Sequence, residues 1–126
     1  MLSRIMERAR AHEKEIVELR RHFHMNPELS WKEVETTKKV VEVLERLGYT
    51  IVKKGFGGTE SGVVADLKRG KCGPCVALRG DMDALPLQEE NDVPYKSRND
   101  GVMHACGHDA HTAMLLGAAM VLREME

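Results

Sequence analysis

The order of apolar and polar positions along the chain predicts helices first, then short strands, then a last helix. Over residues 3–24, apolar side chains recur on one helical face and charged side chains fill the others, which is typical of an amphipathic helix. Pro27 ends this helix, because the residue before a proline is pushed out of the helical region. The predicted apolar face consists of Ile5, Ala9, Ile16, Leu19 and Phe23.

A second helix is predicted between Ser30 and Gly48. Ser30 and Glu33 have the spacing of a capping box at a helix start, and Gly48 is typical of the position that follows a helix end. Between these signals, helical spacing is kept by Val34, Thr37, Val41 and Leu44.

β-prone sequence follows this second helix. Three short runs rich in β-branched residues predict strands, and they are residues 49–52, 62–67 and 76–79. Residues 84–102 carry the turn signals of an irregular segment, and a final helix is predicted from about Asp109 to the end of the chain. The order of these elements predicts an α/β fold in which a sheet is layered with helices.

Composition excludes several classes of function. A chain of 126 residues has the length of one domain, and its 19 basic and 20 acidic residues leave no excess positive charge for nucleic acid. Aromatic residues, which many nucleic-acid binders stack against bases, are scarce. No apolar run is long enough to span a bilayer, and the densely charged residues 3–21 do not resemble a signal peptide. We therefore expect a cytoplasmic protein without a nucleic-acid or membrane partner.

The strongest chemical signal is the stretch Gly101–His111, which holds three histidines, a cysteine and an aspartate. Read as an extended segment, it projects His104, Cys106 and His108 to one side. Imidazole and thiolate on one side of a strand end are typical of a zinc-type site, and Gly107 lets the backbone bend around an ion. Taken singly, each of these residues is better explained as a turn residue or a small buried side chain. Together, within eight positions and beside Asp109 and His111, they favour metal binding.

Two carboxylates and a further histidine extend this candidate site. Asp81 and Asp83 follow a predicted strand and share a face of an extended chain, which suits metal ligation or the orientation of a metal-bound imidazole. An aspartate-rich turn before Pro86 is the alternative. His111 is a candidate ligand, a hydrogen-bonding partner of a ligand or a helix cap, and we favour the partner role or a contact with substrate.

Cys72 and Cys75 have the C-x-x-C spacing of a redox site. In thioredoxin-like sites the first cysteine opens a helix, whereas here Cys75 leads directly into the predicted strand 76–79. We therefore expect a turn, in which a local disulfide or adventitious metal binding stays open, and we do not expect a redox function.

Three blocks of sequence resemble the aminoacylase/carboxypeptidase family of metal-dependent amidohydrolases, the M20 peptidases, in the subgroup of hippurate and indole-acetyl-amino-acid hydrolases. They occur in the family's order and the likeness runs through nearly the whole chain. The blocks are Arg20–Ser30, Leu78–Pro86 and Gly101–His111.

This resemblance implies a two-metal site in which Cys106 and His108 are metal ligands and Asp83 is the catalytic aspartate that orients the site from behind. Asp81 stands where the wider family has a metal-binding histidine, so its role stays open. The metals polarise the scissile carbonyl and activate a water, and Zn, Mn, Co and Ni all suit such ligands. The implied substrates are small N-acyl amino acids, their conjugates or short peptides.

The same resemblance implies that residues 1–126 are a single partial domain, the N-terminal part of a zinc-peptidase-like catalytic domain with a mixed sheet. The family's general-base glutamate, its remaining ligands and its inserted dimerisation domain lie downstream of this chain. We therefore expect a homo-oligomeric amidohydrolase by family, with little or no hydrolysis by this chain alone. A non-enzymatic metal-binding or interaction module is the alternative.

Overall fold

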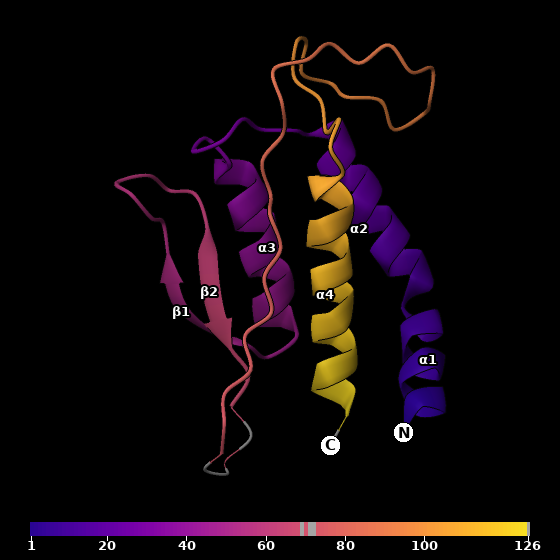
Figure 1. Ribbon diagram of the computed structural model, residues 1–126, viewed down its shortest axis with the longest axis vertical. Helices are drawn as coiled ribbons and strands as arrows, with labels where there is room; N and C mark the ends of the chain where they lie inside the picture. Colours follow the sequence, from indigo (N-terminus) through magenta and orange to yellow (C-terminus); the bar gives the residue numbers. More distant parts are fainter. Residues whose placement is uncertain (69, 71–72, 126) are drawn as a thin grey trace.

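The computed structural model describes residues 1–68, 70 and 73–125. These residues form four helices, one β-hairpin and the irregular segments that connect them. α2 and α3 both pack against α4, and the hairpin packs against α3 (Figure 1). The arrangement confirms the α/β class expected from the sequence. In chain order the elements are α1 (Leu2–Ala11), α2 (Glu13–Met25), α3 (Val34–Arg46), β1 (Thr50–Lys54), β2 (Val63–Asp66) and α4 (His108–Glu124).

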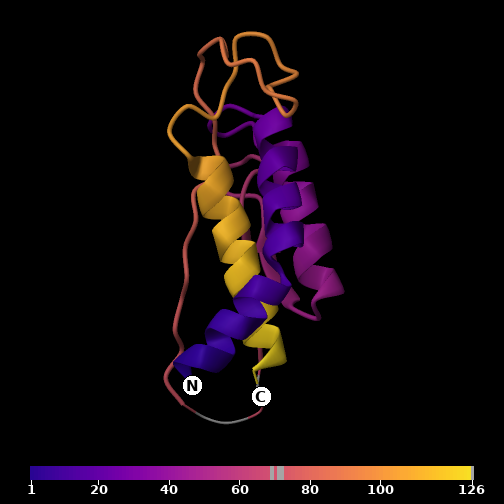
Figure 2. The same cartoon turned by 90° about the vertical axis from the view of Figure 1, so that its right-hand side faces the viewer.

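The single helix predicted over residues 3–24 is wrong in one respect, because it is broken at His12 into α1 and α2. His12 has φ −94° and ψ 0°, and α1 bends away from the axis of α2 (Figure 2). The bend brings α1 onto the end of α4, where Glu124 lies 3.3 Å from Nη1 of Arg8 and 2.9 Å from Nε2 of His12. The break is therefore accompanied by a contact distant in sequence, which a local pattern does not contain.

The start of α3 corrects the predicted capping box. α3 begins at Val34, and its N-cap residue Glu33 forms no side-chain capping bond, while Ser30 lies in the preceding turn. Glu28 does the capping instead, since its Oε1 accepts hydrogen bonds from the backbone N–H and the hydroxyl of Thr36 at 2.6 and 2.7 Å. A carboxylate at this end of a helix satisfies N–H groups that have no partner inside the helix.

β1 and β2 pair antiparallel, with a bulge between Ile51 and Lys53, and they confirm two of the three predicted strands. The prediction of a strand at 76–79 is wrong for the described residues, because this segment runs extended beside α4 without a strand partner (Figure 1). A β-prone run becomes a strand only where a neighbour accepts its backbone hydrogen bonds.

The alternatives left open for Cys72 and Cys75, a local disulfide or adventitious metal binding, lie outside the described residues, because Cys72 is not among them; Cys75 itself is exposed.

An apolar core lies between α2, α3 and α4. Its largest members are Phe23, Leu116 and Met120, which are nearly inaccessible to solvent. α2 and α4 approach closely at Gly117, where a Cβ would lie only 2.6 Å from Cδ1 of Ile16. The whole cluster of buried residues is Leu19, Phe23, Val40, Val43, Leu44, Ala113, Leu116, Ala119 and Met120.

α4 starts at His108, one residue before the predicted start, and buries most of one face in this core. It is the longest described helix, with 17 residues. In the part of the chain that the structure describes, no helix is both long and apolar enough to cross a membrane.

Candidate metal centre

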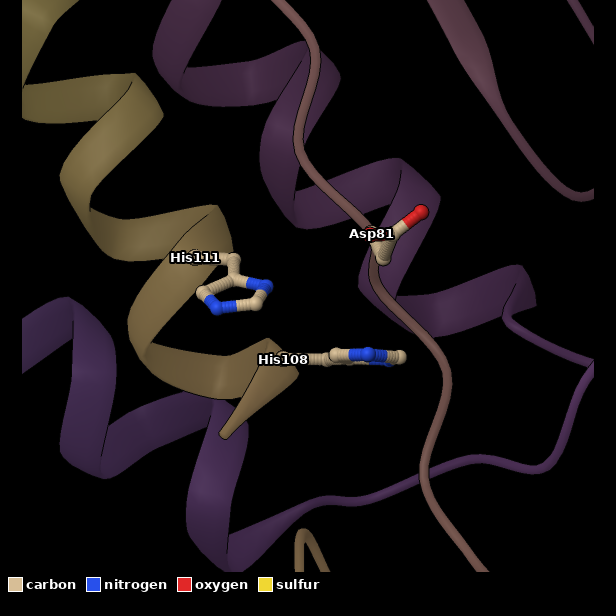
Figure 3. A group of neighbouring side chains, drawn as sticks. All are labelled: Asp81, His108 and His111. Carbon is tan, nitrogen blue, oxygen red and sulfur yellow. The ribbon is translucent and has the colours of Figure 1, made fainter. Parts of the chain in front are cut away.

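The first turn of α4 presents two histidines on one face. His108 opens the helix and His111 follows about one turn later, so both rings project from the same side (Figure 3). Their ring centroids are 5.3 Å apart. Gly107 precedes them with φ +103°, a conformation that glycine adopts without a Cβ clash, and the predicted backbone bend at this residue is confirmed.

Residues 80–83 pass close to this turn. At Gly80 a Cβ would lie 3.1 Å from Cδ2 of Leu115 and 3.3 Å from the carbonyl oxygen of His111, so glycine allows the approach without displacing its neighbours. The hydroxyl of Thr112 donates to the carbonyl oxygen of Asp81 at 2.9 Å. These contacts hold Asp81 beside the first turn of α4.

Asp83 orients the ring of His108. Its Oδ1 lies 2.7 Å from Nδ1 of that ring, and its carbonyl oxygen lies 3.1 Å from the same nitrogen. Because two oxygens face Nδ1, this nitrogen carries the proton and donates, which leaves the lone pair of Nε2 for a metal. This is the contact expected of a carboxylate that orients a metal-bound imidazole.

Asp81, His108 and His111 each offer a donor atom, and these atoms all lie within 4.8 Å of one another. Figure 3 shows both rings projecting from α4 toward the segment that carries Asp81. One carboxylate and two imidazoles are ligands that Zn, Mn, Co and Ni accept, so the donor set fits a divalent metal. Asp81 also forms an exposed ion pair with Arg79 at 3.0 Å, a weak contact that a metal can replace.

The extended reading of residues 104–108 is wrong. His104 is buried, at 5% exposure, whereas Cys106 is exposed, so the two side chains do not project to one side. The backbone bends at Cys106 and Gly107, just before α4 begins. Burial lowers the pKa of His104, whose two ring nitrogens are buried without a hydrogen-bond partner among the described residues. Cys106 lies outside the donor group, and its role as a ligand stays a prediction.

A buried ionic network lies at the same end of α4, and sequence reasoning missed it. Nδ1 of His24 lies 2.7 Å from Oδ2 of Asp109, and its Nε2 lies 2.9 Å from Oε1 of Glu89. Nε of Arg20 is 2.9 Å from the same oxygen of Asp109. The one signal in the sequence is that Arg20 and His24 are four residues apart on a helix, and therefore share a face.

Both carboxylate oxygens of Glu89 have hydrogen-bond partners in this network. Its Oε2 accepts from the backbone N–H of Ser97 at 2.6 Å, and its Oε1 lies 3.3 Å from Nδ2 of Asn91. Burial by itself would raise the pKa of Glu89, but the hydrogen bonds from His24, Ser97 and Asn91 outweigh it and hold the pKa below its usual value. A carboxylate held in this way is poorly placed to accept a proton from a reacting water.

Residues 77–126 match the profile of Peptidase family M20/M25/M40. Thermostable carboxypeptidase 2 of Saccharolobus solfataricus is 53% identical over 107 residues, which are 85% of this chain and 27% of that protein. Hippurate hydrolase of Campylobacter jejuni is 48% identical over 108 residues, which are 86% of this chain and 27% of that protein. The resemblance to the M20 amidohydrolases carried by the three sequence blocks is confirmed.

A solved structure shares the fold. It is the Bacillus subtilis YXEP protein, described as a dinuclear metal binding peptidase from the M20 family, with a TM-score of 0.84 and 44% sequence identity. The match covers 91% of this chain and 32% of that one. The chain therefore spans about a quarter to a third of the length of the relatives that it matches.

Proposed function

We propose, from the relationship of this chain to the M20 peptidase family, that it carries part of the metal centre of an amidohydrolase that cleaves N-acyl amino acids or short peptides. The observation that carries the proposal is the grouping of Asp81, His108 and His111 within 4.8 Å, with Asp83 bonded to the His108 ring. Relatives named as a carboxypeptidase and a hippurate hydrolase support this substrate class.

In this proposal Cys106 and His108 are the ligands implied by the family resemblance, and Asp81 and His111 are the donors that the geometry adds. A divalent metal held there would polarise a carbonyl group and lower the pKa of a bound water. Asp83 fixes the tautomer of His108, so that the lone pair of Nε2 would be available to a metal. We propose two metals per complete site, with zinc as the first candidate and Mn, Co and Ni as alternatives.

We expect little or no amide hydrolysis by the 126-residue chain alone. The resemblance implies that the general-base glutamate lies downstream, and the local candidate Glu89 is already engaged by His24 and Ser97. A homo-oligomeric, cytoplasmic enzyme is part of the same proposal.

A metal-binding or interaction module without activity is the second candidate function. The observation in its favour is that Val76 and Leu78 are 82% and 55% exposed, in an extended segment that pairs with no strand in the described part of the chain. Neighbouring apolar residues at the surface beside unpaired backbone groups are typical of a surface that pairs with another chain.

Calorimetric titration with Zn²⁺ tests the metal centre, and hydrolysis of hippurate tests the activity. We expect the wild-type chain to bind zinc and His108→Ala to weaken this binding by at least about tenfold. His12→Ala is the matched control, because it removes a histidine that lies near the other end of α4, beside Glu124. Equal zinc affinity in wild type and His108→Ala contradicts the metal centre, and turnover of hippurate by the pure chain contradicts its inactivity.

A further inference from the structure

We propose that His24 is a positioning residue of the metal centre, because through Asp109 it fixes the first turn of α4, from which His108 and His111 project. This inference rests on the proposed function, since it gives a further residue a part in the same site. It also gives a role to the first sequence block, Arg20–Ser30, which supplies none of the candidate ligands.

His24 is held between two carboxylates. Nδ1 faces Asp109 at 2.7 Å and Nε2 faces Glu89 at 2.9 Å, and the three side chains are at most 5% exposed. A neutral imidazole has one N–H and one lone pair, so it donates to only one carboxylate, whereas a ring with a proton on each nitrogen donates to both. Arg20 adds a positive charge beside Asp109, and burial of these two carboxylates without partners would carry a large energetic cost.

Asp109 connects His24 to the turn of α4 that carries the candidate ligands. It lies in the first turn of α4, between His108 and His111, and its side chain is completely buried. Its Oδ2 contacts both Nδ1 of His24 and Nε of Arg20. Its Oδ1 has no hydrogen-bond partner among the described residues. The described hydrogen bond and ion pair of this side chain therefore both come from α2, and loss of His24 leaves Arg20 as its one described partner.

The ring of His24 also contacts two residues of the irregular segment 84–102. Glu89, which accepts from His24, also accepts from the backbone N–H of Ser97 at 2.6 Å. Tyr95 meets the ring of His24 edge to face, with centroids 5.6 Å apart. His24 of α2 thus contacts both the irregular segment and the first turn of α4. Figure 1 shows this segment and the start of α4 at the same end of the fold.

Zinc affinity and amide hydrogen exchange of the 126-residue chain test this role. His24→Gln keeps a donor for one carboxylate and removes the ring that lies between Asp109 and Glu89. His22→Gln is the matched control, because His22 lies on the same helix, packs edge to face with Phe23, and has Lys39 and Glu42 of α3 among its nearby charged groups. Val43→Ala is the control for global stability, since it opens a cavity at a buried residue of α3.

We expect His24→Gln to weaken zinc binding about tenfold and to speed amide exchange at residues 108–112 relative to α3. The visible spectrum of bound Co²⁺, which reports the ligand arrangement, should change in the same variant. His22→Gln and Val43→Ala should leave the zinc affinity and the Co²⁺ spectrum unchanged, although Val43→Ala lowers stability. Unchanged zinc affinity and unchanged exchange at 108–112 in His24→Gln overturn the proposal.

If His24→Gln does not fold, Glu89→Gln replaces it, because it keeps the side-chain shape and removes one of the two charges that face the ring. The same increase in amide exchange at residues 108–112 is expected for Glu89→Gln, and its absence overturns the proposal. If the wild-type chain binds no zinc, the proposed function fails, and hydrogen exchange alone decides the role of His24. Faster exchange confined to the first turn of α4 then supports the role, and unchanged exchange overturns it.

Discussion

Replacing Asp83 should weaken metal binding while barely changing stability. The carboxylate of Asp83 lies 2.7 Å from Nδ1 of His108, and the two side chains are 28% and 23% exposed. A partly exposed contact of this kind contributes about 1 kcal/mol or less to folding. Its larger effect is on the orientation and basicity of the ring that offers Nε2 to the metal.

The expected loss of zinc affinity depends on which acceptor still faces Nδ1 of His108 after Asp83→Ala. Loss of a hydrogen-bonding partner of a metal ligand typically lowers metal affinity by about 10–100-fold. The carbonyl oxygen of residue 83 still faces Nδ1 of His108 at 3.1 Å, so the ring keeps one acceptor and its tautomer. We therefore expect a loss near the lower limit, about tenfold or about 1.4 kcal/mol, and a smaller loss for Asp83→Asn, which keeps an oxygen acceptor.

Calorimetric titration with Zn²⁺, together with urea denaturation of the metal-free chain, measures both quantities. Asp92→Asn is the control, because it removes an exposed carboxylate that does not belong to the donor group. Zinc affinity that is unchanged in Asp83→Ala would refute the assignment of Asp83 as the residue that orients His108. A large loss of stability with unchanged zinc affinity would make Asp83 a structural residue only.

Phe23→Ala should lower the free energy of unfolding by about 3–5 kcal/mol, because this ring is almost completely buried in the core, and a loss below about 1 kcal/mol in urea denaturation would argue against that core. Gly107→Ala places a Cβ at φ +103° and should cost about 1–3 kcal/mol by calorimetry, whereas unchanged stability would show that the bend tolerates a side chain. The pKa of Glu89 is held below its usual value of about 4.3, so the unfolded state binds more protons and stability falls as the pH drops below about 4.3. In Glu89→Gln this dependence should be shallower in acid-denaturation curves, and an equal slope would contradict the shift.

Elements with strong local signals were predicted well. The start of α4 and both hairpin strands follow from periodicity and β-branched runs, which depend only on neighbouring residues. The break at His12 was not predictable, because the amphipathic pattern continues through it and its partner Glu124 is distant in sequence. The capping of α3 was misassigned for a related reason, since Glu28 reaches the helix from outside the usual capping position.

The residues of the candidate site could be predicted from the sequence, but their arrangement in space could be predicted only in part. The three-residue spacing of His108 and His111 at a helix start places both on one face, and spacing alone gives that much. The approach of Asp81 and Asp83 depends on close packing at Gly80 against α4, which only the fold provides. The buried network was missed because Glu89 comes from an irregular segment, where side-chain direction has no periodicity.

X-ray absorption spectroscopy of the zinc-loaded chain tests the central claim most directly, because it reports the atoms that bind the metal. The proposed centre predicts a shell of nitrogen and oxygen at about 2.0–2.2 Å with imidazole scattering, and at most one sulfur, from Cys106, at about 2.3 Å. Two or more sulfur ligands would place the metal on the other cysteines and contradict the assignment of His108, His111 and Asp81. Failure of the chain to retain zinc would contradict a metal centre in this part of the protein.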